Sequence, residues 1–335
     1  MPFVERSAIE RGFAPIFDAQ IAPRIDALEA ERREAVQTGN RKVKIATAVG
    51  LVAGIALSLI FGNWVLLLVF GLAGLIVGFV LRGLGADRWL RKLHEVVIPP
   101  VVSFVCHLEY TREPSTGFPL GAMGDLGLFG SYNRKSLTHH LSGTWRDTSF
   151  EMVQAHLRRR SSGGSNSSGT TRTIFMGLLF SIEVPGGAPT PILIARDYGK
   201  VGNQLAGFFS FGKRRGMPRV AFEHHRFEEL FEVHAEDPEA ARAFMPDAFL
   251  DTLISIGDTE GGKEGAKSMT AGFEGERFFL ALSRELGFMQ VGHVDRSILD
   301  IEDALHALFD DLTLIRRIID RLHGEQPVDA QGQMI

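Results

Sequence analysis

The stretch IATAVGLVAGIALSLIFGNWVLLLVFGLAGLIVGFVL, residues Ile45–Leu81, contains no charged side chain. One straight helix over this stretch would be about 55 Å long, whereas the hydrocarbon core of a bilayer is about 30 Å thick. The stretch is interrupted at Gly62-Asn63, which favours a turn, and Trp64 is typical of a membrane interface. We therefore predict a transmembrane helical hairpin at 45–81, with spans at 45–61 and 64–81. The alternative is a pair of core helices in a soluble protein, but such helices rarely extend this far without a charged residue.

Glycines spaced four residues apart occur in both predicted spans. Gly50 and Gly54 lie in the first span, and Gly74 and Gly78 lie in the second. Small residues at this spacing let helix backbones approach closely in lipid. We expect the two spans to pack on each other at these glycines, although glycine is also simply common in membrane helices.

Basic residues flank the apolar stretch on both sides, and the connecting turn carries no charge. They are Arg41, Lys42 and Lys44 before the first span and Arg82, Arg88, Arg91 and Lys92 after the second. Positive flanks stay in the cytoplasm, so both termini are predicted to be cytoplasmic. The stretch lies too far from Met1 for a cleaved signal peptide.

Composition excludes several classes of protein. The chain has 335 residues, with 36 Lys and Arg against 40 Asp and Glu, which argues against a strongly basic nucleic-acid binder. A hydrophobic content of 45% with 23% charged residues excludes a disordered chain. The single cysteine, Cys106, excludes an internal disulfide framework and a Cys-rich zinc module.

Residues 1–44 are predicted to form a cytoplasmic amphipathic segment with a helix over Pro23–Gln37. Its apolar stripe has helical spacing and consists of Phe13, Phe17, Ile21, Ile25 and Leu28. The stripe is expected to pack on the protein's own soluble domain; the inner leaflet and a partner helix are the alternatives.

Residues 82–324 are predicted to form an α+β domain with antiparallel strands. A short helix over Asp87–Val97 should end at Pro99-Pro100. Glycine-rich Gly117–Gly130 is expected to be a loop, as is the flexible, serine-rich stretch 158–171, and 325–335 should be a loose tail. Helices are expected after Asp237 and after Pro246. The predicted strands are Val101–Tyr110, Thr148–Leu157, Thr173–Val184, Pro191–Ala195, Phe231–Ala235, Met269–Phe273 and Arg277–Ser283.

A long amphipathic helix is predicted near the C-terminus. Ser297 with Asp300 matches a capping box, and Gly324 follows the last apolar position. The apolar spacing also suits a coiled coil, but Phe309 and Ile318 occupy positions where a coiled coil prefers charges. We therefore favour packing of this helix on the protein's own sheet.

Several segments together resemble a known family. These are "FDAQIAPRIDALEAERREA" before the hairpin, "IFMGLLFSIEVP", "FEELFEVHAEDPEAARAFMPDAFLDTL" and "GERFFLALSRELGFM". The chain is similar to the bacterial DUF3137 family of membrane-anchored proteins of unknown function, over roughly Phe13–Leu322. The resemblance implies a bacterial inner-membrane protein and, as a partner class, LemA-type membrane proteins. It supplies no catalytic residue.

No catalytic, cofactor-binding or metal-binding residue is predicted. His224 and His225 beside Glu223, with His234 nearby, do not suit a metal site, because adjacent histidines on a strand point to opposite faces. Gly199–Gly202 lacks the remaining residues of a phosphate-binding loop. No Gly-x-Ser-x-Gly nucleophile motif is present.

One basic segment merits a hypothesis. Phe208–Phe211 and Arg219–Phe222 are predicted to form a hairpin whose tip carries Lys213, Arg214 and Arg215. Aromatic residues beside cations suit anionic lipid headgroups, while nucleic acid is disfavoured. A solvated tip over buried phenylalanines is the plainer interpretation.

We predict a membrane-anchored, non-enzymatic interaction or scaffold module that contacts the lipid bilayer. The alternative is a membrane-anchored enzyme, hydrolytic or lipid-modifying, whose site is assembled from scattered residues. A pocket with convergent ionisable groups would favour the enzyme, whereas an apolar surface would favour the module.

Overall fold

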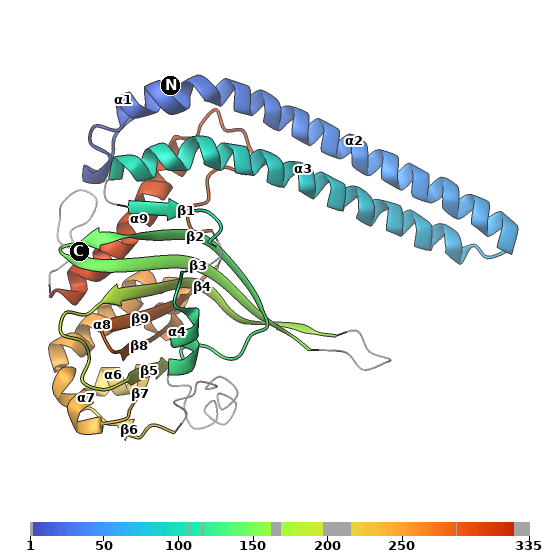
Figure 1. Cartoon of the computed structure of the whole chain (residues 1–335). Coiled ribbons are helices and arrows are strands. Elements are labelled where there is room, and N and C mark those ends of the chain that lie inside the picture. The colour runs from blue at the N-terminus through green and yellow to red at the C-terminus, as the bar shows by residue number, and fades with distance from the viewer. Residues whose placement is uncertain are drawn as a thin grey trace. The chain divides into compact units, whose positions relative to one another are not determined.

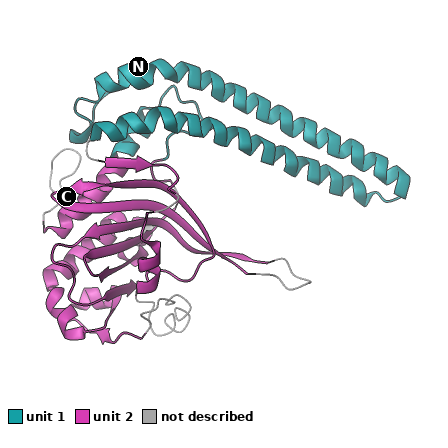
Figure 2. Ribbon diagram, viewed as in Figure 1, with its two compact units in different colours: residues 1–105, 290–309 teal, residues 106–289, 310–335 magenta. Residues whose placement is uncertain are grey.

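The structure, a computed structural model, describes residues 3–105, 108–114, 117–161, 169–196, 216–285 and 287–324 (Figure 1). The chain forms two compact units (Figure 2). Unit 1 comprises Met1–Val105 and Gln290–Phe309, and unit 2 comprises Cys106–Met289 and Asp310–Ile335.

Unit 1 contains two long antiparallel helices, α2 at Ala22–Phe61 and α3 at Val65–Val105 (Figure 1). Helix α2 is terminated by Gly62, the residue after its last turn, whose φ of 65° lies in the left-handed region that glycine adopts without strain. The Asn63 side chain accepts a hydrogen bond from the backbone N–H of Val65 at 3.0 Å, which caps the start of α3. The predicted break at Gly62-Asn63 is confirmed.

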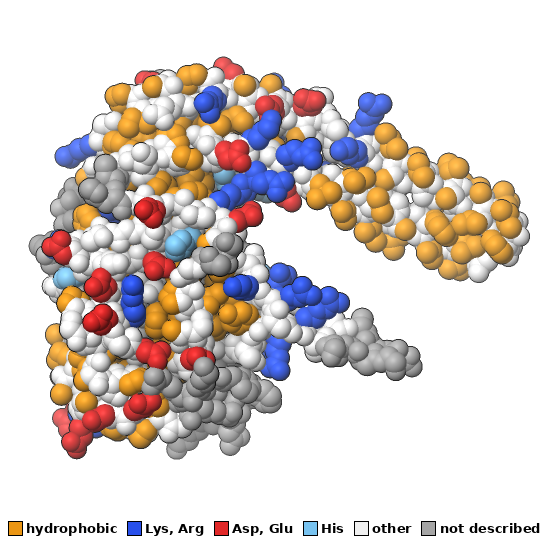
Figure 3. Space-filling model, in the orientation of Figure 1, with side chains coloured by type: hydrophobic (Ala, Val, Ile, Leu, Met, Phe, Trp, Pro, Cys, Tyr) orange, Lys and Arg blue, Asp and Glu red, His pale blue; other side chains and the backbone are white. Residues whose placement is uncertain are grey.

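The apolar parts of both helices are exposed. Each helix contains a window long and apolar enough to cross a membrane. Among the described residues, every exposed large apolar side chain except Val4 and Leu299 lies between Ile45 and Leu84. Figure 3 shows this apolar surface at the end of the helical pair, with basic side chains where it begins. Water is a poor solvent for such a surface, whereas lipid suits it.

Short helical turns lead into α2. They are η1 at Ala8–Glu10, α1 at Ala14–Ile16 and the π-helical η2 at Phe17–Ile21. The π turn lies directly before Pro23, which has no N–H to donate to the preceding turn. The chain is therefore helical from Ala14 to Phe61, well beyond the predicted Pro23–Gln37.

The N-terminal apolar stripe is buried within unit 1. The ring centroid of Phe13 lies 5.3 Å from that of Phe104 and 4.9 Å from that of Phe309. Trp89 on α3 donates from Nε1 to the carbonyl oxygen of Leu28 at 2.9 Å. The stripe thus packs on other parts of the same unit, and the leaflet and partner-helix alternatives are not needed to cover it.

Pro99 and Pro100 lie inside α3, so the predicted helix end before them and the predicted strand from Val101 are wrong. A proline costs a helix interior about 3 kcal/mol because it removes a hydrogen bond. Here the surrounding side chains of Ile98, Val101 and Val102 are at most 4% exposed. Fully burying each of them contributes roughly 1.5–3 kcal/mol, which offsets that cost.

The described residues of unit 2 include a nine-stranded antiparallel sheet in the order β1-β2-β3-β4-β9-β8-β5-β7-β6 (Figure 1). The strands are β1 Leu108–Thr111, β2 Arg134–Trp145, β3 Thr148–Arg160, β4 Thr171–Glu183, β5 Ile192–Arg196, β6 Arg219–Val220, β7 Phe231–Ala235, β8 Met269–Glu274 and β9 Arg277–Ser283. The predicted α+β class is confirmed. Strand β2 was not predicted, and β3 and β4 extend into the stretch 158–171 that was predicted to be loop.

Two apolar layers cover the sheet. One contains α4 at Leu120–Leu126, which lies in the predicted loop Gly117–Gly130, and packs Met123 and Leu126 with Val153, Leu157 and Leu179. The other contains α8 at Asp247–Glu260 and the end of α9 at Glu302–Leu322. Shorter helices are α6 His225–Leu230, α7 Pro238–Phe244 and the 3-10 segment η3 Gly262–Ser268.

Helix α9 begins at Glu302, later than the predicted cap at Ser297. The backbone N–H of Ile298 donates to Glu29 Oε2 on α2 at 3.1 Å, and Ser297 Oγ accepts from the N–H of Leu299 at 3.3 Å. These bonds hold the segment in a turn outside the helix. The apolar residues Leu305, Leu312 and Ile319 of α9 are fully buried. This is what packing of the helix on the protein itself requires.

Candidate functional site

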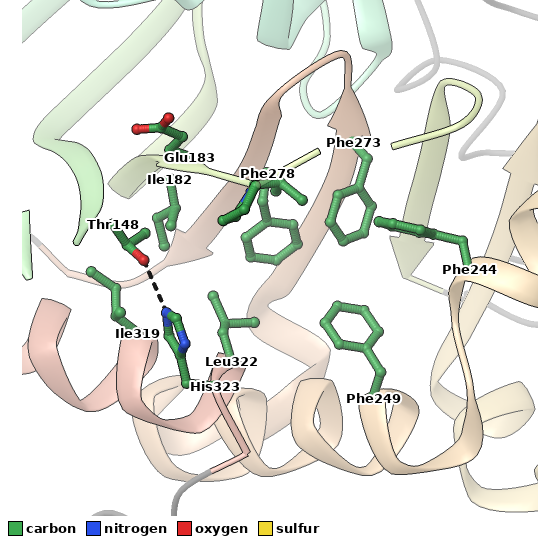
Figure 4. A pocket seen from close by; sticks show the side chains of 12 residues that line it. Thr148, Ile182, Glu183, Phe244, Phe249, Phe273, Phe278, Ile319, Leu322 and His323 are labelled. Carbon is green, nitrogen blue, oxygen red and sulfur yellow. Dashed lines mark hydrogen bonds between the residues drawn. The ribbon is translucent and has the colours of Figure 1, made fainter. Parts of the chain in front are cut away.

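Unit 2 contains an apolar pocket of about 320 Å³ between the sheet and its helices (Figure 4). This volume lies at the lower end of the range for ligand pockets, roughly 300–1,000 Å³. The lining comes from the start of β3, the end of β4, the β8–β9 hairpin, α7, α8 and the end of α9. The residues are Thr148, Ile182, Glu183, Val184, Pro185, Phe244, Phe249, Phe273, Phe278, Ile319, Leu322 and His323.

Four phenylalanines form one side of the pocket. Phe273 and Phe278 are direct partners in the β8–β9 hairpin, and their ring centroids lie 4.8 Å apart. Phe244 on α7 meets Phe273 edge-to-face at 5.2 Å, and Phe249 on α8 lies 5.7 Å from it. Aromatic rings at these distances form a large, rigid apolar wall.

Local capping and turns place these phenylalanines. Asp237 Oδ1 accepts hydrogen bonds from the backbone N–H groups of Glu239 and Ala240, both at 3.0 Å, and so starts α7. Pro246 separates α7 from α8, which turns the chain between Phe244 and Phe249. Gly275, with a φ of 57°, forms the tight turn between Phe273 and Phe278.

The polar side of the pocket is a Thr148–His323 pair. Thr148 Oγ1 and His323 Nε2 lie 2.9 Å apart and are joined by the dashed line in Figure 4, and Thr148 is 3% exposed. Arg146 and Asp147 both have positive φ, which is the geometry of a two-residue hairpin turn and puts Thr148 first in β3. The other ionisable side chain in the pocket lining besides His323 is Glu183, which is exposed.

Asp320 lies three residues before His323, near the end of α9. Its Oδ1 accepts a hydrogen bond from Trp145 Nε1 at 2.8 Å and lies 2.6 Å from Arg146 Nε. These bonds tie the end of α9 to the β2–β3 turn that carries Thr148. Among the described residues, no carboxylate pairs with His323.

The glycines predicted for helix packing lie where α2 and α3 approach each other. A Cβ added at Gly50 would lie 2.4 Å from the carbonyl oxygen of Phe70, and one at Gly54 would lie 2.8 Å from the Cα of Leu67. A Cβ at Gly74 would lie 2.4 Å from the carbonyl oxygen of Ala46. One at Gly78 would lie 2.7 Å from the Cα of Val43. The structure thus brings all four positions to one helix–helix contact.

Other predicted features lie outside the described residues. These are the hairpin segment Phe208–Phe211, the basic tip at Lys213, Arg214 and Arg215, the Gly199–Gly202 segment, the serine-rich stretch 162–168 and the tail 325–335.

The histidines have local structural partners. His224 caps α6: its Nδ1 accepts from the N–H of Phe227 at 3.2 Å, and its Nε2 lies 2.9 Å from Asp251 Oδ1. The expectation that His224 and His225 lie on a strand is therefore wrong. Over the described ranges, no three His, Cys, Asp or Glu side chains converge on a point that could hold a metal ion.

A second surface feature lies at the projecting ends of β2, β3 and β4. We call it the basic strand end; it consists of Arg134, Lys135, Arg158, Arg159, Arg160 and Arg172. Figure 3 shows basic side chains gathered there. The run Arg158–Arg160 is visible in the sequence, but the stretch was interpreted as loop, and only the strand pairing brings Arg134 and Arg172 beside it.

The fold and pocket thus define an α+β protein with an antiparallel sheet, an apolar cavity and two apolar helices able to cross a membrane. The model of the DUF3137 family, proteins of unknown function, matches residues 173–323. The resemblance drawn from the sequence is confirmed over that range, which includes most of the pocket.

Two further comparisons add little. No curated protein matches the chain. Among solved structures, the mycobacterial trehalose monomycolate transport factor A, TtfA, matches at 11% identity with a TM-score of 0.31, covering 66% of this chain and 90% of its own.

Proposed function

We propose that the chain is a membrane-anchored, non-enzymatic binding module whose pocket in unit 2 holds a single acyl chain. The observation that carries this proposal is the lining: four phenylalanines with Ile182, Ile319 and Leu322, and only a Thr–His pair and a peripheral glutamate as polar groups. Apolar surface contributes roughly 25 cal/mol per Å² on leaving water, so an alkyl chain gains most from this cavity.

The proposed anchor is the α2–α3 hairpin, inserted in the bacterial inner membrane with both termini in the cytoplasm. The basic flanks of the apolar stretch, with Arg41, Lys42 and Lys44 before it and Arg82 after it, support this orientation. The close approach of Gly50 and Gly74 supports a packed helical pair. An anchored domain always has acyl chains at high local concentration.

Photolabelling tests the proposal. The full chain is reconstituted in nanodiscs that contain a fatty acid with a photoreactive diazirine near its methyl end, and labelled peptides are identified by mass spectrometry. We expect labels in the apolar spans and also in peptides that carry Phe244, Phe249 and Leu322. The spans serve as an internal control, because lipid reaches them whether or not the pocket binds.

A variant whose pocket is filled by a larger side chain distinguishes labelling in the pocket from labelling in the spans. Val184 lines the pocket and is half-buried, so Val184→Trp should fill it and remove the labels in unit 2 while the span labels persist. Ile174→Trp makes a similar change at a half-buried position that packs against the α4 layer and should leave all labels in place. Two outcomes would overturn the proposal. In one, the parent chain carries no label in unit 2; in the other, the labels in unit 2 persist in Val184→Trp.

The Thr148–His323 pair favours a second candidate function, hydrolysis of an acyl ester. A hydroxyl 2.9 Å from an imidazole has the spacing of a nucleophile and its general base. The group that orients the base in such sites is not among the described residues, which is why we rank this function second. Hydrolysis of p-nitrophenyl octanoate that survives Thr148→Ser and is lost in Thr148→Val would establish the enzyme. The absence of turnover would leave binding as the function of the pocket.

A further inference from the structure

The basic strand end places like charges directly opposite each other. In the strand register, Arg134 lies opposite Arg158 and Arg159 lies opposite Arg172. Like charges in directly opposed positions destabilise an antiparallel pair. Two such pairs at one end of the sheet cost stability. Features that cost stability locally are typical of functional sites.

On β2 and β3, no described carboxylate neutralises the charges of Arg134, Arg158 and Arg159. Among the described residues, none of the basic side chains on β2 and β3 at this end forms an ion pair. The acidic residues of these strands and their turn, Asp147, Glu151 and Glu183, lie at the opposite end. Arg158 also has a buried Nε without a hydrogen-bond partner. An external anion would therefore relieve repulsion at the basic strand end.

The available hydrogen bonds suit a phosphate group. Arg134, Lys135, Arg159 and Arg160 are exposed, and they present guanidinium and ammonium donors on neighbouring strands. Guanidinium groups bind phosphate oxygens in a bidentate manner. Single-stranded nucleic acid would also need aromatic side chains for base stacking. Within the described part of unit 2, no large aromatic side chain is exposed, which favours a headgroup over a base.

We propose that the basic strand end binds the phosphate headgroups of anionic phospholipids. The inference uses the membrane anchorage proposed above but not the acyl pocket. An anchored chain meets headgroups at high effective concentration, so several weak phosphate contacts suffice. The expected consequence is that unit 2 contacts a bilayer only when that bilayer carries anionic lipid.

Site-specific fluorescence quenching tests this proposal. In a Cys106→Ser background, Ser136→Cys places a bimane label on an exposed β2 position beside Lys135. The full chain is reconstituted in nanodiscs that carry a nitroxide on some headgroups, with either phosphatidylcholine alone or added phosphatidylglycerol. We expect quenching with phosphatidylglycerol, little with phosphatidylcholine, and loss of quenching at about 0.5 M NaCl, where the screening length is only a few ångströms.

Charge-matched variants separate this surface from net charge. Arg134→Gln/Lys135→Gln/Arg160→Gln should raise the phosphatidylglycerol content needed for half-maximal quenching at least about tenfold. Arg226→Gln/Arg242→Gln/Lys267→Gln removes as many exposed charges elsewhere in unit 2 and should leave the titration unchanged. Circular dichroism checks that both variants fold, and span photolabelling checks that both remain inserted.

The remaining outcomes contradict the proposal. Equal quenching in both lipids, or equal effects of the two triple variants, would overturn it. Release by inorganic phosphate at constant ionic strength would identify a site for free phosphate instead, and tight binding of single-stranded RNA that removes the quenching would identify a nucleic-acid surface. Loss of pocket photolabelling with normal quenching would overturn the acyl-binding function alone.

Discussion

Gly50 and Gly74 face each other across the α2–α3 pair so closely that a Cβ added to either would lie 3.1 Å from the Cα of the other. The same added atom at Gly50 would lie 2.4 Å from the carbonyl oxygen of Phe70, so the backbones must separate to admit it. Overpacking of this kind costs about 1–3 kcal/mol. We expect Gly50→Ala to lower the melting temperature of unit 1 in detergent, followed by Trp89 fluorescence.

Gly83, which also lies in α3, provides the control for Gly50→Ala. A Cβ built at Gly83 meets no neighbouring atom within 4 Å. Gly83→Ala should be neutral or stabilising, since alanine favours helix by roughly 0.5–1 kcal/mol over glycine. Equal effects at both positions would show that glycine flexibility, and not close packing, matters at Gly50.

Glu29 should make the stability of unit 1 fall in acid. Its carboxylate accepts hydrogen bonds from Arg32 and from the N–H of Ile298, and the Arg32 bonds, more than any other contact, lower its pKa to about 2. A folded pKa below the ordinary 4.5 means that the folded state binds this proton more weakly. The stabilisation, about 3 kcal/mol, is therefore complete above pH 4.5 and is lost as the pH falls toward 2.

Denaturation of the parent chain and of Glu29→Gln between pH 3 and 7, again followed by Trp89 fluorescence, checks this expectation. The variant should be less stable at neutral pH and should show a smaller loss in acid. Parallel pH profiles would mean that the Glu29 ion pairs do not contribute to folding.

How much of the fold is predictable depends on whether the deciding contacts are local. The hairpin turn at Gly62-Asn63 follows from local chemistry and is predicted correctly. The continuation of α3 through Pro99 is not predictable in that way, because it depends on the burial of Ile98 and Val101 by distant residues. Likewise, the late start of α9 results from a hydrogen bond between Ile298 and Glu29, which are far apart in sequence.

The same distinction applies to the sites. Phe273 and Phe278 flank a recognisable turn, but their role as a pocket wall requires Phe249 from α8 and Ile319 from α9. Thr148 and His323 carry no motif, and only the fold brings them together. The Arg158–Arg160 run is a local signal, but the adjacent Ser/Gly stretch favours a loop, so its pairing with β4 is not predictable from the sequence.

Asp311 should make unit 2 less stable as the pH rises from about 4 to about 6. Burial raises the pKa of its carboxyl to about 6, although the N–H of Met289 donates to it at 2.6 Å. The folded state therefore holds this proton more tightly than the unfolded state, whose pKa is near 3.8. Stability is highest below about pH 4, declines between pH 4 and 6, and stays reduced above that by on the order of 1–3 kcal/mol.

Asp311→Asn tests this directly, because the amide oxygen still accepts the Met289 hydrogen bond without ever carrying a charge. We expect the variant to be more stable than the parent chain at pH 7 and equal to it near pH 4. Trp145, which lies in unit 2, reports the transition in a background where Trp64 and Trp89 are replaced by Phe. A variant that is less stable at both pH values would refute the expectation.

Glu260 is expected to be the most sensitive single position in unit 2, because it pairs with two arginines of α9. Glu260 Oε1 lies 3.0 Å from Arg317 Nε and 3.1 Å from Arg321 Nη1, and the side chains of Glu260 and Arg321 are only 6% and 5% exposed. Removing one member of a buried ion network leaves uncompensated charge and costs about 3–5 kcal/mol. Glu260→Gln should therefore lower the free energy of unfolding of unit 2 by that amount, as measured by urea denaturation followed by Trp145 fluorescence.

Glu264 supplies the matched comparison, because it pairs with Arg196 at 3.2 Å but is 64% exposed. Glu264→Gln should cost less than about 1 kcal/mol, as exposed pairs do. The triple variant Glu260→Leu/Arg317→Leu/Arg321→Leu removes all three charges together and should be less destabilised than Glu260→Gln alone, because no charge is left buried without a partner. If the triple variant instead loses more stability than the single one, the ion network itself, and not the avoidance of unpaired charge, holds α9 in unit 2.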